Sequence, residues 1–287
     1  AGVLAANGIH VRLYEELMPV PALSFATRYY HCNAGIMITA SHNPAQYNGI
    51  KLCRALAAPV GMETGLAEIK DLVARSEVKT HSLKGAITDV DVLDAYADFL
   101  LGLAPVAGRR LKVVVDAGNG MAGLTAPAVL GKLDLAVTEM YYELDGTFPN
   151  HEANPIEPAN LVDLQDKVRE TGADIGLAFD GDADRCFLVD QAGALVSPSV
   201  LTALIAVREL RKEPGAAIIH NLITSKGVPE IVAEHGGKPV RTRVGHSFIK
   251  AKMAETGAIF GGEHSGHFYF RDFWRADSGM LAALHAL

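Results

Sequence analysis

The sequence predicts an α/β protein built from three successive α/β units. Strand-like and helix-like runs alternate along the chain, which is the pattern of layered α/β folds. The 287 residues suit two or three domains of ordinary size. Three units of roughly one hundred residues each can be traced, and domains commonly have this size. We therefore expect domains over residues 1–90, 91–208 and 209–287.

The first unit contains a helix end, a buried strand and a second helix. Residues 1–8 read as the tail of a helix that closes on a glycine. Residues 34–39 are short and apolar, which predicts a buried strand running into a polar loop. Residues 66–75 have helical spacing, and the charged stretch 76–89 is expected to be irregular.

The second and third units repeat the alternation. A helix over residues 90–103 ends at a break that contains Pro and Gly, at 104–108. The next expected elements are a strand at 111–116, a tight turn at 117–120, a helix at 124–130, a loop at 145–158, a helix at 161–171 closed by Gly172, and a strand at 174–179. A helix over 200–210 precedes a strand at 216–220, a helix at 228–234 and a strand at 240–244.

Composition argues against several classes of partner. The formal net charge of -7 gives no reason to expect nucleic acid or an anionic membrane. No apolar run is long enough to span a bilayer. Cys32, Cys53 and Cys186 are sparse and lack metal-ligand spacing, which favours reduced thiols and a cytoplasmic location. There is no initiator Met or signal peptide, and residues 278–285 form a helix pattern without a stop signal, so we expect an internal fragment.

Three carboxylates, Asp180, Asp182 and Asp184, stand at alternate positions directly after the strand at 174–179. Like charges this close raise one another's pKa values unless a cation lies among them. Hard oxygen ligands favour Mg²⁺, and the carboxyl end of a strand is where α/β sheets bind ligands. Gly181 is expected to let the backbone turn sharply between the first two ligands. A solvated acidic turn is the alternative interpretation.

Two other kinds of site begin with similar carboxylates. An EF-hand loop requires Gly at its sixth position and Glu at its twelfth, where this chain has Arg185 and Gln191. A phosphatase with an aspartyl nucleophile could use Asp180 and Asp182, but that leaves Asp184 and Arg185 unexplained. Three metal ligands and an arginine that faces phosphate suit phosphoryl transfer, where positioning and charge neutralisation do most of the catalysis.

The second candidate loop is Thr-Ala-Ser-His-Asn-Pro at residues 39–44. A serine hydroxyl becomes a good nucleophile only with help from a base or a metal, and Ser41 has His42 beside it in a rigid turn. An N-cap serine in an ordinary turn is the alternative, since adjacent side chains seldom face each other. Lys51 follows ten residues later as a candidate proton shuttle or phosphate ligand, although most lysines are solvated surface charges.

The third candidate loop is the glycine-bracketed run at residues 261–267. If this loop is extended, Glu263, Ser265 and His267 point the same way. A carboxylate with a hydroxyl reads sugar hydroxyls well, and a histidine can serve as general acid or base. The paired glycines suggest the close approach of a ligand. Nearby, Arg243 and His246 could hold phosphate or sugar, although Arg243 also suits an exposed strand end.

These loops, in this order, resemble the α-D-phosphohexomutase family. Residues 39–44 look like its phosphoserine loop, 180–185 like its metal loop and 262–267 like its sugar-recognition loop. The third loop and residues 268–274 look most like bacterial phosphomannomutase/phosphoglucomutase. The resemblance runs along the whole chain. It implies three α/β domains with mixed sheets between helices, which carry the phosphoserine, the metal site and sugar recognition in that order.

The resemblance also implies a mechanism. Ser41 would carry a phosphoryl group, and Mg²⁺ would be held by Asp180, Asp182, Asp184 and a phosphoserine oxygen. Arg185 would contact the phosphoserine. The phosphoryl group would pass to a hexose phosphate, and the resulting hexose 1,6-bisphosphate would turn around and return its other phosphate.

The remaining roles concern the sugar and the protons. Glu263 and Ser265 would grip the 3- and 4-hydroxyls of the sugar in either orientation. Because mannose and glucose differ only at C2, this grip does not rank them. Lys51 and His267 are candidates for the proton transfers, while His42 would support the loop.

The chain departs from the family in what it lacks. The family's C-terminal fourth domain, which holds the non-reacting phosphate of the substrate, is expected to be absent, as are parts of the first and third domains. We therefore expect a poor mutase. The rivals are phosphoglucosamine mutase, where a glutamine is expected at His264, a Mg²⁺-dependent phosphatase, and a non-catalytic protein that binds phosphosugars.

Overall fold

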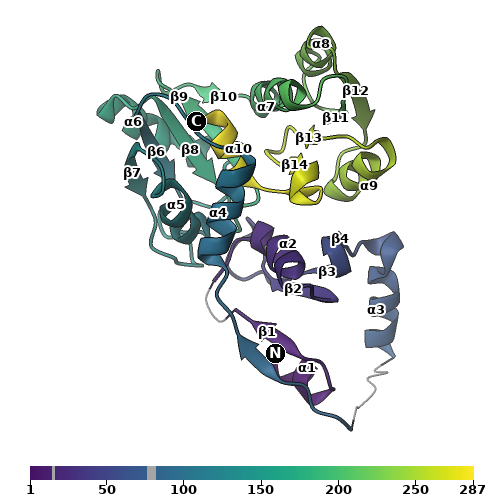
Figure 1. Cartoon of the computed structure of the whole chain (residues 1–287). Helices are drawn as coiled ribbons and strands as arrows, with labels where there is room; N and C mark the ends of the chain where they lie inside the picture. The colour runs from purple at the N-terminus through teal and green to yellow at the C-terminus, as the bar shows by residue number, and fades with distance from the viewer. Residues whose placement is uncertain (15–16, 76–81) are drawn as a thin grey trace.

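The computed structural model describes residues 1–14, 17–75 and 82–287. It confirms the predicted fold class, with α-helices and β-sheets in each of three successive units and mixed sheets in the second and third (Figure 1). Short 3₁₀ helices join several of these elements: η1 (Ala55–Ala57), η2 (Met62–Thr64), η3 (Pro158–Leu161) and η4 (Arg271–Phe273).

The first unit holds two small sheets. Strands β2 (Ala34–Ile38), β3 (Ile50–Arg54) and β4 (Ala58–Pro59) form an antiparallel sheet, while β1 (Val11–Leu13) pairs in parallel with β5 (Ile87–Asp89). Its helices are α1 (Gly2–Ala6), α2 (Val20–Tyr29) and α3 (Leu66–Ala74).

Strand β5 corrects the prediction of an irregular stretch over residues 76–89. Ile87, Thr88 and Asp89 are all exposed, so no buried face marks the strand in the sequence. The pairing with β1 decides its conformation, with Val11 opposite Ile87. The first part of that stretch, residues 76–81, lies outside the described residues.

The second unit is a five-stranded sheet in the order β10-β9-β8-β6-β7. Strands β6, β7 and β8 run in parallel, whereas β9 and β10 are antiparallel additions. The strands are β6 (Leu111–Asp116), β7 (Leu135–Met140), β8 (Ile175–Phe179), β9 (Cys186–Asp190) and β10 (Leu195–Val196). The helices are α4 (Leu93–Leu103), α5 (Ala122–Leu130) and α6 (Val162–Thr171).

The third unit is a second mixed sheet, in the order β12-β11-β13-β14-β15. Strands β11, β12 and β13 are parallel, and β14 and β15 return antiparallel. The strands are β11 (Ala217–Asn221), β12 (Lys238–Thr242), β13 (Phe260–Gly262), β14 (Phe268–Phe270) and β15 (Ala276–Asp277). The helices are α7 (Pro198–Lys212), α8 (Gly227–Glu234), α9 (His246–Thr256) and α10 (Gly279–Ala286).

Alternate residues of the strands enter cores on opposite faces of each sheet. Val113 and Val115 of β6 join the large core, whereas Val114 between them packs in a separate core with residues of α6. In the third unit, Phe268 of β14 joins the large core and Tyr269 faces the residues of α9. This period of two is the geometry of a strand covered on both sides, and it sets which side chains can reach the strand ends.

The first unit contacts both of the others around α2. The Val20 backbone N–H donates to the Asp182 carbonyl at 2.9 Å, which attaches the start of the helix to the loop after β8. Phe25 of the same helix lies 5.6 Å from the Tyr96 ring and 6.4 Å from the Trp274 ring, measured between centroids. In Figure 1, α2 accordingly lies beneath α4 and the β14 region.

Two general expectations can be compared with this architecture. Within residues 1–14, 17–75 and 82–287, no helix combines the length and the apolar character that a bilayer span requires. Cys32, Cys53 and Cys186 are free thiols, as predicted.

Buried His285 on α10 leads to a prediction about pH and stability. Its ring is 2 % exposed and stacks on Phe270 at 5.3 Å, and burial lowers its pKa to about 3, with help from the nearby Lys212 and Arg208 cations. Below about pH 6.5 the imidazole of His285 takes up a proton in the unfolded chain, whereas in the folded chain it stays neutral down to about pH 3. The contribution of this group to the free energy of unfolding is therefore complete above about pH 6.5 and falls as the pH drops toward 3. We expect the unfolding free energy to lose roughly 1 kcal/mol per pH unit from this group.

Urea unfolding at pH 7 and pH 5 measures this effect. The comparison is with His285→Phe, which keeps an aromatic ring against Phe270 but cannot titrate. The variant should lose distinctly less stability over that interval than the natural chain. Equal losses in the two proteins would show that His285 does not contribute.

Candidate active site and metal centre

The three predicted loops meet at one place, although they are far apart in the sequence. Ser41 follows β2, the turn at residues 180–185 joins β8 to β9, and the turn at residues 263–267 joins β13 to β14. Arg185 and His267 form an isolated antiparallel bridge, and a backbone bond of 3.1 Å joins the next residue, Cys186, to the Gly266 carbonyl. One loop from each unit therefore contributes to a single site.

Ser41 faces both a carboxylate and its neighbouring histidine. Its Oγ donates to Asp182 Oδ1 at 3.2 Å and lies 3.2 Å from His42 Nδ1. Its backbone N–H donates to Thr39 Oγ1 at 2.8 Å, and that hydroxyl donates to Asp182 Oδ2 at 3.1 Å. Ser41 has a φ of 56°, in the left-handed region that costs a non-glycine residue on the order of 1 kcal/mol. In this conformation the adjacent Ser41 and His42 side chains do face each other, unlike most adjacent pairs.

The three carboxylates are buried and close together. Asp180, Asp182 and Asp184 are 0 %, 3 % and 2 % exposed, and each offers an oxygen within 4.8 Å of the others. Among the described residues, Asp180 Oδ2 and Asp184 Oδ1 accept no hydrogen bond. Buried acceptors without donors are costly, so a ligand that supplies positive charge is favoured here.

Gly181 was expected to let the backbone turn sharply between the first two ligands, and that explanation was wrong. Its φ is not positive, and the left-handed residue of this turn is Ala183, with a φ of 56°. A Cβ at Gly181 would instead lie 2.5 Å from the Ser41 carbonyl oxygen. The glycine therefore lets the serine loop approach the carboxylate loop.

Burial and mutual repulsion set the protonation of the trio. Burial raises the pKa of Asp180 well above its ordinary value, and the charges of Asp184 and Asp182 add to the effect. Burial and Asp184 likewise raise the pKa of Asp182. The pKa of Asp184 is held well below its ordinary value, because the charges of His267 and Lys51 outweigh the effect of its burial.

Lys51 on β3 supplies a cation to this cluster. Its Nζ donates to Asp182 Oδ2 at 2.9 Å and to Asp184 Oδ2 at 2.8 Å. Burial acts to lower the pKa of Lys51, but these carboxylates outweigh it and raise the pKa above its ordinary value. Three hard carboxylate ligands, two of which have an oxygen without a hydrogen-bond donor, fit a divalent metal ion.

Arg185 links the carboxylates to two histidines. Its Nη2 lies 3.0 Å from His42 Nδ1, and its Nε donates to His267 Nε2 at 3.2 Å. The same Nε lies 3.4 Å from Asp180 Oδ2. Burial, followed by the charge of Arg185, lowers the pKa of His42. This arrangement favours the neutral form of His42.

The third loop is a tight hairpin turn and not the extended segment that the sequence suggested. The Gly266 backbone N–H donates to the Glu263 carbonyl at 3.2 Å, which closes the turn. Ser265 Oγ and His267 Nδ1 nevertheless meet at 2.9 Å. The turn therefore brings these two side chains together by curvature and not by strand alternation.

The paired glycines Gly261 and Gly262 were expected to mark the close approach of a ligand. In the structure they lie against protein side chains instead. A Cβ at Gly262 would lie 2.4 Å from Thr202 Oγ1, and a Cβ at Gly261 would lie 3.1 Å from Ile249 Cγ2. These glycines let α7 and α9 pack closely on β13.

Glu263 is 2 % exposed and holds three hydrogen bonds. Its Oε1 accepts from Asn221 Nδ2 at 3.1 Å and from the Gly245 backbone N–H at 3.0 Å, and its Oε2 accepts from the Tyr269 hydroxyl at 2.7 Å. The hydrogen bond from Gly245 holds the loop that precedes α9 against Glu263. Arg243 in that loop and His246 at the first position of α9 are exposed, and Arg243 lies over the Phe248 ring at 4.5 Å.

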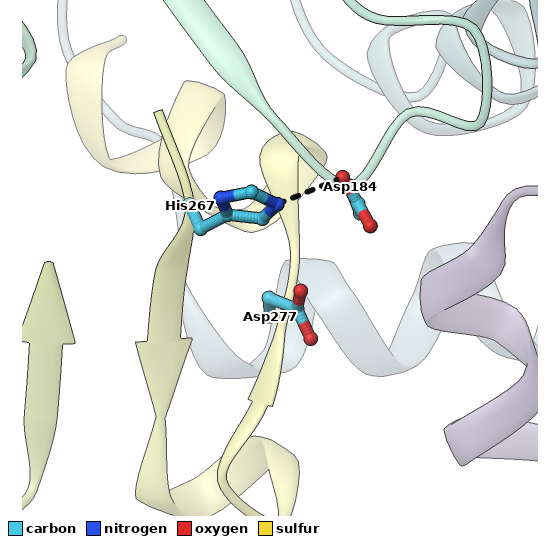
Figure 2. A group of neighbouring side chains, drawn as sticks. All are labelled: Asp184, His267 and Asp277. Carbon is cyan, nitrogen blue, oxygen red and sulfur yellow. Dashed lines mark ion pairs between the residues drawn. The ribbon is translucent and has the colours of Figure 1, made fainter. Parts of the chain in front are cut away.

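The sequence analysis missed Asp277 and Lys250. Asp277 ends β15, is 8 % exposed, and its Oδ1 accepts from Lys250 Nζ at 2.7 Å. Its carboxylate lies with Asp184 and His267 in a second close group of ligand-type side chains (Figure 2). One signal was available, because Asp277 stands at a strand end directly before the Ser-Gly that opens α10, just as Asp180 follows β8.

Comparison with known proteins agrees with this geometry. Models of phosphoglucomutase/phosphomannomutase α/β/α domains I, II and III match residues 1–79, 94–193 and 197–287, in that order. The chain is a member of the α-D-phosphohexomutase family. The three matched domains of this family member each supply one of the loops described above.

Similar phosphohexomutases come from several bacteria. A phosphomannomutase/phosphoglucomutase of Pseudomonas syringae is 42% identical over 285 residues, covering 98% of this chain and 59% of the relative. A phosphomannomutase of Escherichia coli is 42% identical over 266 residues, covering 90% and 58%. The crystal structure of a family protein from Burkholderia thailandensis superimposes with a TM-score of 0.91 at 35% identity, covering 98% of this chain and 62% of that one. The chain thus spans less than two thirds of these relatives.

Proposed function

We propose that this chain carries the phosphoryl-transfer centre of a phosphohexomutase. The reaction is the interconversion of hexose 6-phosphate and hexose 1-phosphate, with mannose or glucose as the sugar, through a hexose 1,6-bisphosphate. The supporting observation is Ser41 Oγ, which lies 3.2 Å from a buried carboxylate of the Asp180–Asp182–Asp184 cluster. This contact supports the proposal, because a metal held by the cluster and a nearby arginine would neutralise phosphoryl charge next to the nucleophile.

Phosphoryl transfer begins from phosphorylated Ser41. A sugar hydroxyl oxygen attacks phosphorus, its proton passes to a base, and the bond between phosphorus and Ser41 Oγ breaks. In the reverse transfer Ser41 Oγ attacks the other phosphate and loses its own proton, while the bond between that phosphorus and the sugar oxygen breaks and the sugar oxygen takes up a proton. Lys51 and His267 are the proposed partners of these proton transfers, and His42, whose Nδ1 lies 3.2 Å from Ser41 Oγ, is proposed to support the loop. Asp180, Asp182, Asp184 and Ser41 would hold Mg²⁺, which neutralises charge on the phosphoryl oxygens when bound.

Sugar recognition falls to the third unit. Glu263 and Ser265 are proposed to hold the 3- and 4-hydroxyls, and Arg243 with His246 a phosphate or the sugar. A carboxylate has about four acceptor sites, and three of those on Glu263 are used by Asn221, Gly245 and Tyr269, so one remains for a hydroxyl. Arg185 is proposed to contact the phosphoserine, since it lies between His42 and Asp180.

Each proposed domain carries one part of this machinery. Residues 1–90 would carry the phosphoserine, 91–208 the metal and 209–287 the sugar contacts. The cytoplasmic location favoured by the free thiols also belongs to this proposal. The partners would be hexose phosphates and the bisphosphate.

Product analysis tests the proposal. The chain is incubated with Mg²⁺ and glucose 1,6-bisphosphate, and its intact mass and the sugar products are followed. We expect one phosphate on the chain and both glucose 1-phosphate and glucose 6-phosphate in solution. Release of inorganic phosphate, with no phosphorylated chain and no monophosphate exchange, would instead indicate a phosphatase. Phosphoglucosamine mutase is the less favoured rival, because the relatives are named for mannose and glucose.

A further inference from the structure

A second group of ligand-type side chains lies beside the carboxylate trio and belongs to different elements. Asp184 comes from the turn after β8, His267 from the residue before β14, and Asp277 from the end of β15 (Figure 2). Each offers one ligand atom within 4.8 Å of the others. Asp184 and Asp277 are buried and His267 is nearly so, with a side chain that is 16% exposed.

The two oxygens of Asp184 face different neighbours. Oδ2 accepts from Lys51, whereas Oδ1 is buried, accepts no hydrogen bond from the described residues, and lies 3.4 Å from His267 Nε2. That nitrogen accepts from Arg185 Nε at 3.2 Å, so a metal ion must displace the arginine before it can use the lone pair of this ring nitrogen. A buried carboxylate oxygen without a hydrogen-bond donor is unfavourable unless a cation reaches it.

The spacing of these two atoms suits a small tetrahedral metal ion. Ligand atoms bound at about 2.0–2.2 Å around a tetrahedral Zn²⁺ are separated by roughly 3.3–3.5 Å. The observed distance between His267 Nε2 and Asp184 Oδ1 is 3.4 Å. Ser265 Oγ bonds the other ring nitrogen, Nδ1, at 2.9 Å, which is the outer-sphere support that metal-binding histidines usually have.

We propose that Asp184, His267 and Asp277 form a second divalent-cation site, selective for Zn²⁺ and similar borderline metals. The imidazole nitrogen distinguishes it from the all-oxygen trio, which suits Mg²⁺. Asp184 serves both sites, with one oxygen for each. To bind, the metal displaces Arg185 Nε from His267 and draws Asp277 partly away from Lys250, and water completes the coordination.

The bound ion would join two units of the fold and would prevent His267 from taking part in proton transfer. It connects the turn after β8 to β14 and β15, and it occupies the lone pair of His267. Inhibition by Zn²⁺ in the presence of Mg²⁺ is the expected consequence, and this consequence rests on the proposed function. Binding itself does not, so the test measures binding.

Calorimetry with ZnCl₂ in excess MgCl₂ tests the site, because Mg²⁺ is expected to fill the carboxylate trio. We expect one Zn²⁺ per chain, with affinity reduced at least roughly tenfold in His267→Gln and in Asp277→Asn. The matched control is His264→Gln, an exposed histidine of the same turn, which should bind Zn²⁺ as the natural chain does. With CoCl₂ as probe, the intense visible absorption of tetrahedral cobalt should appear and vanish with the same two variants.

A second measurement avoids any risk that the variants fail to fold. Anomalous scattering from crystals of the unmodified chain soaked in ZnCl₂ should give a peak bounded by His267, Asp184 and Asp277. A peak only among Asp180, Asp182 and Asp184, undiminished binding in both variants, or no Zn²⁺ binding would each overturn the proposal. Because none of these readouts requires turnover, failure of the mutase proposal leaves the outcome interpretable.

Discussion

Ser41→Ala is expected to abolish phosphorylation of the chain by glucose 1,6-bisphosphate, with a rate at least about 10³-fold lower. The reason is the loss of the only oxygen that the proposal allows to accept the phosphoryl group. Folding should change little, because Ser41 is partly exposed and its backbone N–H keeps its bond to Thr39. Intact mass spectrometry over a time course measures the rate.

The matched control for this variant is Ser24→Ala, a partly exposed serine on α2. It should be phosphorylated at the natural rate. Phosphate incorporation that persists in Ser41→Ala would assign the nucleophile elsewhere, and an aspartate of the trio would be the first candidate. That result would favour the phosphatase alternative.

Gly181→Ala should slow the same phosphorylation by roughly 10²-fold, although it adds only one methyl group. The new Cβ would lie 2.5 Å from the Ser41 carbonyl oxygen, and a backbone atom cannot yield as a flexible side chain does. We therefore expect the serine loop to move away from Asp182, which breaks the 3.2 Å contact with Ser41 Oγ. The strain should also reduce the unfolding free energy by about 1–3 kcal/mol.

Gly146→Ala is the matched control, since nothing lies within 4 Å of a Cβ at Gly146. Phosphorylation rates and urea midpoints are compared for both variants and the natural chain. A rate for Gly181→Ala equal to that of the control would mean that the two loops need not be in contact during transfer. The close approach would then be incidental to the chemistry.

Much of the architecture could be predicted because it depends on local patterns. Strand β6 was expected at residues 111–116 and occupies Leu111–Asp116, since its apolar run is buried on both faces. Helix α6 closes on Gly172, which has the left-handed φ of 59° that a helix-ending glycine commonly adopts. Strand β5 was missed because its three residues are exposed and only the parallel partner β1 holds them extended.

Parts of the candidate site were misjudged because they depend on neighbours distant in sequence. The shared direction of Glu263, Ser265 and His267 was conditional on an extended loop, but the antiparallel return of β14 on β13 curls the loop into a turn. Tyr269 and Asn221 bind Glu263 from other strands, and no local spacing marks them. Gly181 was assigned a turn, whereas its role is the approach of the Ser41 loop.

The sequence by itself determined the chemical content of this protein. Each of the three candidate loops is a short run of neighbouring residues: a serine loop, a carboxylate loop and a glutamate–serine–histidine loop. Their residue types and their order can therefore be read from the sequence alone. Only the tertiary structure decided which atoms face one another. Contacts between loops of different units set the 3.2 Å distance from Ser41 Oγ to Asp182 Oδ1 and the 3.4 Å distance from His267 Nε2 to Asp184 Oδ1. The tertiary structure also brings Asp277 to the site, because the register of β15 beside β14, and not its place in the chain, fixes its position.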